Sequence, residues 1–338
     1  MKQAIMVAPG EIQIRQVSAP SAQAGEVLLR IRRIGVCGSD IHVYHGKHPY
    51  TSYPVVQGHE FSATVESVAE GATGIGPGMK VTAMPQITCG TCPPCRRGDW
   101  HICDKLRVWG FQAPGVAQEL FAAPASSIVP LPETFSLEQG ALVEPAAVAA
   151  HAVSRAPNLT GRNVAVLGAG PIGNLVAQAA RAQGAGVLIT DLSEHRLEIA
   201  RRCGLTQTSN PATETLDAAA GRFFGDAGFQ CAFECVGVEA TIAAAIQAIR
   251  KGGTIVVVGV FGQKPRVDLG LVQDRELNVR GTLMYRRDDY ERAIELIASG
   301  AIATAPLESM HFPLERYKAG YEFIDSQRDK IMKVFIDL

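Results

Sequence analysis

The strongest constraint on the fold is a glycine-rich turn between an apolar strand and a helix. The strand NVAVLG covers residues 163–168, and the helical pattern NLVAQAARAQGA covers residues 174–185. In such a turn, one glycine allows the tight bend, a second lets a pyrophosphate approach the backbone, and a third allows close packing of the helix. The helix N-terminus then offers amide donors to the phosphates. The motif predicts a dinucleotide site formed by Gly168, Gly170, Pro171, Ile172 and Gly173.

The next strand, GVLIT, ends at Asp191, where a carboxylate can accept hydrogen bonds from the 2′- and 3′-hydroxyls of a ribose. A 2′-phosphate would be repelled, so the sequence favours NAD over NADP. Arg196 can pack over the adenine or lie as a solvated helix residue, and NADP becomes possible if Arg196 outweighs Asp191. The alternative is a glycine turn that binds no ligand.

Strand and helix patterns divide the chain into two regions. At 338 residues it is long enough for about two domains. The first 130 residues show short strands, including a hairpin at AIMVAPGEIQIRQV and the strand EVLLRIRRIG. From about Gly161, continuous apolar strands alternate with helices, a pattern typical of a parallel sheet covered on both faces. The predicted class is therefore α/β, with a β-rich domain and a doubly wound Rossmann domain.

Four of the eight cysteines form a cluster in a loop rich in Gly, Pro and Arg. The spacing is C-x2-C-x2-C-x7-C, and four thiolates this close can complete a tetrahedron around Zn²⁺ with no open position. A structural zinc site is predicted, with iron–sulfur ligation and redox or disulfide pairing as alternatives. The cluster residues are Cys89, Cys92, Cys95 and Cys103.

A second set of ligand types is dispersed along the chain. Cys37 precedes Ser39 and His42, the pair His59 and Glu60 follows, and Glu144 comes much later. Thiolate, imidazole and carboxylate can hold Zn²⁺ while leaving one position for substrate, which would make this site catalytic. Taken singly, each residue also has an ordinary role in a core, a loop or a solvated surface. Spacing alone does not join them.

Composition limits the partners and the location. The 32 basic and 33 acidic residues give a net charge of −1, so there is no electrostatic footprint for nucleic acid or an anionic membrane. No apolar run approaches the roughly 20 residues of a membrane span, and the start MKQAIMVAPG turns before a signal-peptide core can form. We expect a cytoplasmic protein that acts on small molecules.

The order of these motifs resembles that of the zinc-dependent medium-chain alcohol and polyol dehydrogenases over nearly the whole chain. The series is G-x-C-G-S-D-x-H at 35–42, G-H-E at 58–60, the four-cysteine loop, E-P at 144 and the glycine turn at 168. The resemblance implies a GroES-like catalytic domain from residues 1–150 and 286–338. A Rossmann dinucleotide-binding domain of residues 151–285 would be inserted between these parts.

The resemblance also implies roles for single residues. Cys37 and His59 match ligands of a catalytic zinc, and either Glu60 or Glu144 matches the carboxylate ligand. Ser39 and His42 match a relay that carries the alcohol proton through the nicotinamide ribose to solvent. Two Zn²⁺ per chain, NAD and a homodimer or homotetramer follow as expectations. In that chemistry, zinc lowers the pKa of the substrate hydroxyl, and hydride passes from the same carbon to NAD⁺.

Two departures bear on the substrate. Ala63 stands where the family pattern has glycine, and Met284 falls where sorbitol dehydrogenases carry an arginine. The stretch around H-x-Y-H-G at 42–46 is similar to sugar-acid oxidoreductases such as L-galactonate 5-dehydrogenases. We therefore expect oxidation of a secondary alcohol in a sugar acid or polyol. The basic residues closest to the expected pocket along the chain are Lys47, Arg286 and Arg287.

Two other functions stay open from the sequence. One is a dehydrogenase of L-threonine or of a diol, which would keep the same zinc and nucleotide residues. The other is a zinc-stabilised binding protein without enzymatic activity. A binding protein would have no use for the glycine turn with Asp191, nor for an open set of Cys, His and Glu.

Overall fold

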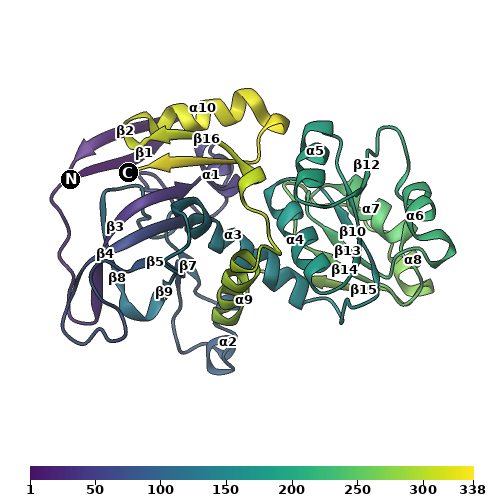
Figure 1. Cartoon of the computed structure of the whole chain (residues 1–338), viewed down its shortest axis with the longest axis horizontal. Coiled ribbons are helices and arrows are strands. Elements are labelled where there is room, and N and C mark those ends of the chain that lie inside the picture. Colours follow the sequence, from purple (N-terminus) through teal and green to yellow (C-terminus); the bar gives the residue numbers. More distant parts are fainter. The chain divides into compact units, whose positions relative to one another are not determined.

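The computed structural model describes all residues from 1 to 338, and the chain divides into two compact units (Figure 1). The first unit comprises Met1–Glu144 and Glu308–Leu338, and the second comprises Pro145–Leu307. Helix α3, Leu137–Ser154, runs through the first of these limits. The domain boundaries expected after residue 150 and before residue 286 stay a prediction.

A seven-stranded sheet forms the centre of the first unit. Its order is β16-β17-β3-β4-β5-β9, and β8 also pairs with β3. On β3, Val27, Leu29 and Ile31 are buried while the residues between them are half-buried, as expected for a strand with one face on the core. The strands are β3 (Glu26–Gly35), β4 (Glu60–Val68), β5 (Lys80–Ala83), β8 (Leu120–Pro124), β9 (Ile128–Pro130), β16 (Glu308–Pro313) and β17 (Lys333–Asp337).

Smaller elements surround this sheet. The hairpin expected at the N-terminus is confirmed, because β1 and β2 pair antiparallel with Lys2 opposite Gln16. The four-cysteine loop contains a single helical turn and is bordered by a two-stranded ribbon. These elements are β1 (Lys2–Ala8), β2 (Glu11–Gln16), α1 (Gly38–Tyr44), β6 (Gln86–Ile87), α2 (Pro93–Arg96), β7 (Arg107–Val108) and α10 (Tyr317–Gln327).

The end of the chain is part of the first unit's core. Strand β17 pairs antiparallel with β3, with Phe335 opposite Gly35, and parallel with β16. The side chain of Phe335 is fully buried and packs with Ala141 and Leu142 of α3. The final apolar run of the sequence therefore forms the last strand, and the burial of Phe335 against α3 holds this strand in place.

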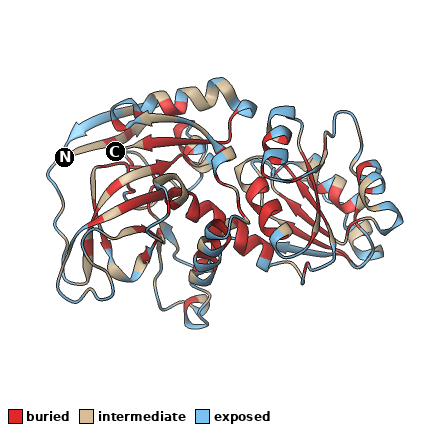
Figure 2. Ribbon diagram, viewed as in Figure 1, coloured by how far each residue is buried: buried red, intermediate tan, exposed pale blue.

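The second unit is built on a six-stranded parallel sheet of order β12-β11-β10-β13-β14-β15. In chain order this is 3-2-1-4-5-6, which is the doubly wound Rossmann topology, so the predicted fold class is confirmed. The strands β10, β11 and β13 are almost entirely buried (Figure 2). The six strands are β10 (Asn163–Leu167), β11 (Gly186–Thr190), β12 (Gln207–Ser209), β13 (Cys231–Glu234), β14 (Thr254–Val257) and β15 (Asn278–Gly281).

Helices connect these strands, as the alternation in the sequence predicted. The helices of the second unit are α4 (Pro171–Ala182), α5 (Glu194–Arg202), α6 (Leu216–Phe224), α7 (Glu239–Ala248), α8 (Leu269–Asp274) and α9 (Arg287–Ala298). The strand order reverses between β10 and β13, where Leu167 pairs with Glu234. At such a point the connections leave on opposite sides and open a crevice at the carboxyl ends of the strands, where ligands bind.

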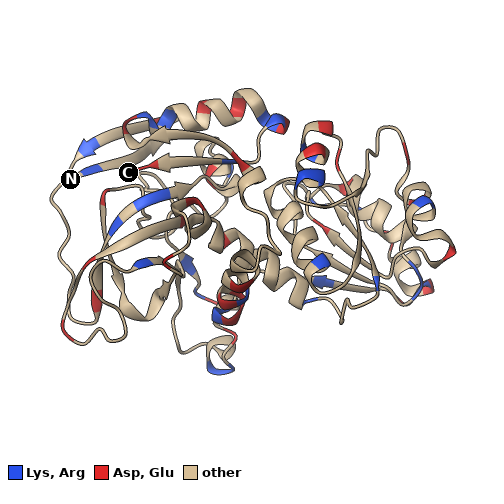
Figure 3. Cartoon of the chain, viewed as in Figure 1, with Lys and Arg blue, Asp and Glu red and all other residues tan.

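Charged residues of both signs occur along both units, and on α9 acidic and basic residues lie within the same few turns (Figure 3). Every helix is either too short or too polar to cross a bilayer.

Replacement of Phe335 by alanine should lower the free energy of unfolding of the first unit by about 3–5 kcal/mol, because it leaves a cavity behind β17. Both tryptophans, Trp100 and Trp109, lie in the first unit, so their fluorescence in a urea titration reports this transition. Ile14, which is 39% exposed on β2, provides the control, and Ile14→Ala should change the value by less than about 0.5 kcal/mol. Equal effects of the two substitutions would contradict the role given to Phe335.

Candidate active site and metal centres

Two neighbouring strands bring three of the predicted zinc ligands together. Cys37 follows β3 and caps the N-terminus of α1, while His59 and Glu60 stand at the start of β4. The antiparallel register places Gly35 opposite Glu60. As a result, the ligand atoms of Cys37, His59 and Glu60 all lie within 4.8 Å of one another. A Cβ at position 35 would lie 2.5 Å from a carboxylate oxygen of Glu60, so any larger residue here would displace that carboxylate.

The fourth candidate, Glu144, is buried on α3. Burial lowers the pKa of His59, but the charge of Asp40, contact with Cys37 and the charge of Glu144 outweigh it and raise this pKa well above its usual value. Burial and the Glu60 charge also raise the pKa of the Cys37 thiol. The pocket thus gathers buried anionic donors beside a thiol and an imidazole, and this donor set fits a zinc ion.

A buried lysine completes this pocket, and sequence analysis missed it. The Nζ atom of Lys333, on β17, lies 3.0 and 2.7 Å from the two carboxylate oxygens of Glu60 and 3.2 Å from the carbonyl oxygen of Val36. Lys333 is 3% exposed and Glu60 is 1% exposed. Burial lowers the pKa of Lys333, but the charges of Glu60, Cys37 and Glu144 and the hydrogen bond to Glu60 together outweigh burial and raise it. The sequence KVFIDL contains no signal that its lysine, Lys333, would pair with Glu60, which is far away along the chain.

Asp40 lies behind His59. It is 1% exposed, and its Oδ2 accepts a hydrogen bond from the Cys37 backbone N–H at 3.0 Å. Its Oδ1 accepts from Gln57 Nε2 at 3.2 Å and lies 3.6 Å from His59 Nδ1. Burial raises the pKa of this carboxyl, against the opposing charge of His59. Of the two predicted relay residues, Ser39 is half-buried on the first turn of α1 and His42 is exposed near its end.

Two aromatic rings form one wall beside His59. The Phe111 ring centroid lies 4.9 Å from that of His59, and the His48 ring stacks on Phe111 at 4.7 Å. The Nδ1 atom of His48 is 2.7 Å from the Thr51 hydroxyl. Sequence analysis missed this wall, because its members come from loops that are distant along the chain.

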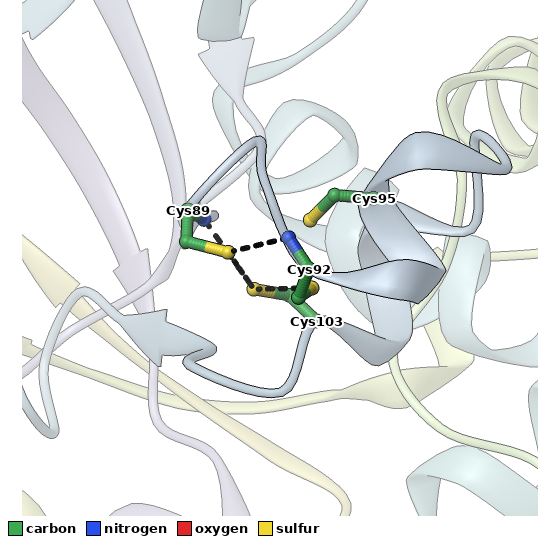
Figure 4. Close-up of side chains that lie close together, drawn as sticks. All are labelled: Cys89, Cys92, Cys95 and Cys103. Carbon is green, nitrogen blue, oxygen red and sulfur yellow. Dashed lines mark hydrogen bonds between the residues drawn. The ribbon is translucent and has the colours of Figure 1, made fainter.

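The four cysteines of the loop converge, and Figure 4 shows their sulfur atoms facing one another. The Sγ of Cys103 lies 3.8 Å from that of Cys92 and 3.6 Å from that of Cys89. Zn–S bonds of about 2.3 Å in a tetrahedron separate sulfurs by about 3.8 Å, whereas a disulfide bond is about 2.05 Å long. All four thiols are free. The geometry therefore fits a tetrahedral metal site and excludes the disulfide alternative.

Backbone amides prepare this loop for thiolates. The N–H of Cys92 donates to Cys89 Sγ at 3.4 Å, and those of Cys89 and Lys105 donate to Cys103 Sγ at 3.3 Å. Backbone donors at Thr91 and Cys92 lower the pKa of Cys89 to about 6, while burial raises that of Cys95 to about 12. A hydrogen bond to the charged form stabilises it, so part of the cost of deprotonation is met by the loop itself.

The predicted glycine turn joins β10 to α4. Gly168 has a φ of +101°, Gly170 is the N-cap of α4, and Pro171 occupies the first turn. A Cβ on Gly173 would lie 1.9 Å from the carbonyl oxygen of Gly168, so only glycine allows the helix to start here. With no side chain at these positions, the amides of the helix N-terminus stay open to a phosphate.

Asp191, at the end of β11, supports this turn. Its Oδ2 accepts from the Ala169 N–H at 2.7 Å, and its Oδ1 accepts from the Ser193 N–H at 2.9 Å. Nη1 of Arg196 lies 3.9 Å from Asp191 Oδ2. A carboxylate and a guanidinium are therefore neighbours beside the turn. Each carboxylate oxygen retains a second lone pair for a further donor.

A buried glutamate shapes the facing loop, and sequence analysis missed it as well. Glu234 ends β13, and its Oε1 accepts from the N–H groups of Val236 and Gly237 at 3.0 and 2.8 Å. Thr241 donates to the same oxygen at 2.7 Å. These bonds hold the loop after β13 at the switch point of the sheet, where Val236 packs against Gly168.

Comparison with known proteins places this geometry in a family. The profile of the alcohol dehydrogenase GroES-like domain matches residues 23–133, and that of the zinc-binding dehydrogenases matches residues 171–299. The chain is 38% identical to 2-dehydro-3-deoxy-L-galactonate 5-dehydrogenase from Pseudoalteromonas atlantica, over 91% of this chain and 90% of that protein. It is 31% identical to L-galactonate-5-dehydrogenase from Escherichia coli, over 93% and 92%.

Comparison with solved structures gives the same family as comparison of sequences. A zinc-binding dehydrogenase from Sinorhizobium meliloti, bound to NADP, superimposes with a TM-score of 0.91 at 30% identity, covering 100% of this chain and 99% of that one. The convergent candidate ligands, the doubly wound sheet and full-length similarity lead to one conclusion: the chain is an oxidoreductase that belongs to the zinc-dependent medium-chain alcohol and polyol dehydrogenase family.

Proposed function

We propose that this protein oxidises a secondary hydroxyl of a sugar acid or polyol, with NAD⁺ as acceptor and with two Zn²⁺ per chain. The observation that carries the proposal is the convergence of the ligand atoms of Cys37, His59 and Glu60 within 4.8 Å, with His59 and Glu60 buried and Cys37 half-buried. Three ligand types arranged in this way leave a coordination position for substrate. The similarity to the two galactonate dehydrogenases supports the substrate class.

In this proposal, the catalytic ion is held by Cys37, His59 and a carboxylate from Glu60 or Glu144. Zinc supplies Lewis acidity, which lowers the pKa of an alcohol that approaches it. The chain supplies the other functions. Lys333 offsets the charge of one carboxylate, and the ring of Phe111 forms an apolar wall beside His59. Ser39, which is half-buried, and His42, which is exposed, would form a relay that carries the alcohol proton through the nicotinamide ribose to solvent.

Cys37→Ala should remove one of two zinc ions and abolish turnover without unfolding the protein, because an open site contributes mainly to chemistry. Cys95→Ala should remove the other ion and lower stability, since a closed site contributes to folding. Cys203→Ala is the control, because this thiol is buried like that of Cys95 but lies far from both ligand sets along the chain. Metal analysis after zinc-replete expression tests all three. One ion or none in the unmodified protein would overturn the proposal.

NAD is proposed as the acceptor because Asp191 lies beside the glycine turn and carries a negative charge. NADP is the second candidate, because Arg196 lies 3.9 Å from Asp191 and the S. meliloti relative holds NADP. A guanidinium can pair with a 2′-phosphate, whereas a carboxylate repels it.

Asp191→Asn should lower kcat/KM for NAD⁺ by about ten- to a hundredfold, through loss of charge-assisted hydrogen bonds, and raise it for NADP⁺. Arg196→Met should leave kcat/KM for NAD⁺ unchanged and lower kcat/KM for NADP⁺ below that of the unmodified protein. Steady-state rates with both cofactors give these ratios. An unmodified protein with equal kcat/KM for both would contradict the assignment of NAD.

A substrate carboxylate requires a cation, and Lys47 and Arg286 are the candidates that the sequence suggested. Lys47 is exposed just beyond α1, and Arg286 is exposed at the N-cap of α9. We propose both as contacts made with substrate.

Lys47→Met, or in second place Arg286→Met, should lower kcat/KM for an aldonate by about ten- to a hundredfold, which corresponds to the loss of one charge-assisted hydrogen bond. The value of kcat/KM for the corresponding neutral polyol should change little with the same substitution. Absorbance of the reduced cofactor follows both reactions. If the unmodified protein prefers the polyol, or if neither substitution acts selectively on the aldonate, the sugar-acid assignment fails.

We also propose that the protein works in the cytoplasm as a homodimer or homotetramer. The eight free cysteines support a reducing compartment. Light scattering coupled to gel filtration measures the number of subunits.

A further inference from the structure

A chain of buried side chains runs from helix α10 to the back of the candidate metal ligand His59. The Tyr321 hydroxyl donates to Gln57 Oε1 at 3.0 Å, and Gln57 Nε2 donates to Asp40 Oδ1 at 3.2 Å. Asp40 Oδ1 in turn lies 3.6 Å from His59 Nδ1. Tyr321 is fully buried, and Gln57 and Asp40 are each 1% exposed. These three side chains are therefore shielded from bulk solvent.

The direction of each hydrogen bond is set by its donor. A tyrosine hydroxyl carries one proton, and Tyr321 uses it on Gln57, so the amide oxygen of Gln57 must face the tyrosine and its NH₂ group must face Asp40. Both oxygens of Asp40 then accept, one from Gln57 and one from the backbone N–H of Cys37. Asp40 thus presents an acceptor to His59.

This acceptor decides which nitrogen of His59 carries the proton. A lone pair on Nδ1 facing Asp40 would be repelled, whereas an N–H at Nδ1 is attracted. With the proton on Nδ1, the lone pair stands on Nε2, the form in which an imidazole can ligate a metal ion. The contact at 3.6 Å is a charge interaction rather than a hydrogen bond, and His59 Nδ1 has no other partner within hydrogen-bond distance. Groups that orient a ligating histidine from behind typically change metal affinity by about ten- to a hundredfold.

We propose that Tyr321 and Gln57 are positioning residues that select the metal-binding tautomer of His59 through Asp40. The inference rests on the proposed function in one respect, the assignment of His59 as a zinc ligand. It adds that helix α10, near the end of the chain, controls the affinity of a site formed by residues 37–60.

The neighbouring tyrosine gives a matched control. The hydroxyls of Tyr317 and Tyr321 are 3.3 Å apart, and both side chains are buried on the same helix. Because Tyr321 donates its only hydroxyl proton to Gln57, Tyr317 is the donor in the hydrogen bond between the two tyrosines. Tyr317→Phe therefore removes a buried hydroxyl from the same cluster and leaves the bond to Gln57 intact.

The test compares zinc loss to a chelator in Tyr321→Phe and Tyr317→Phe, following the ion that is missing in Cys37→Ala. Tyr321→Phe should lose this ion about ten- to a hundredfold faster than the unmodified protein, and Tyr317→Phe should stay within about twofold. Gln57→Leu removes the next side chain in the same hydrogen-bonded series, the one that donates to Asp40. It should reproduce the effect, and the double variant should be no worse than Gln57→Leu alone.

A second measurement does not depend on zinc or substrate. In zinc-free protein with ¹⁵N-labelled histidine, at a pH above the raised pKa of His59, the His59 signal, assigned with His59→Gln, should show the proton on Nδ1 and a shift toward Nε2 in Tyr321→Phe. An unchanged tautomer together with an unchanged rate of zinc loss would overturn the proposal, as would equal losses in Tyr317→Phe and Tyr321→Phe. If no ion depends on Cys37, the proposed function fails, and the tautomer measurement alone decides the role of Tyr321.

Discussion

The buried ion pair between Lys333 and Glu60 is the constraint on which the first unit depends. Both groups have left water, and each satisfies the other with bonds of 2.7 and 3.0 Å. Removal of one partner from such a pair typically costs about 3–5 kcal/mol, because the remaining charge is buried alone. The pair joins the first residue of the last strand to the first residue of β4. The end of the chain must therefore be in place before the metal pocket is complete.

The pocket and the four-cysteine loop show two ways to assemble a metal site. The loop gathers its donors within a few turns of chain, and its own amides stabilise the thiolates. The pocket takes Cys37 from the end of one strand, His59 and Glu60 from the start of the next, and places Asp40 and Lys333 behind them. The loop is suited to a closed, structural site. We propose the pocket for chemistry, because three ligand types of this kind can hold an ion and leave one position for substrate.

At the glycine turn, one carboxylate serves two purposes. Asp191 accepts hydrogen bonds from the amides of Ala169 and Ser193, which holds the turn, and it is also the residue that we propose for contact with a ribose. Arg196 beside it carries the opposite charge. In the proposed function, cofactor preference is therefore a balance between two neighbouring charges rather than the property of one residue. Under that proposal, substitution at Asp191 acts on the turn as well as on selectivity.

The sequence by itself determined the features whose parts are close along the chain. The turn from Gly168 to Gly173, Asp191 at the end of the next strand and the alternation of strands and helices were enough for the Rossmann unit. The spacing from Cys89 to Cys103 was enough for a thiolate cluster. In each case the partners are joined by short segments, so local geometry leaves few arrangements.

Only the tertiary structure decided what lies around His59. The register of β3 against β4 places Gly35 under Glu60, the last strand delivers Lys333, and α10 delivers Tyr321. Burial then gives these contacts their strength, because a charge or hydroxyl without water must find a partner inside the protein. A lysine in an apolar run and a tyrosine on a helix have many possible partners. Which of them they meet is a property of the packed fold.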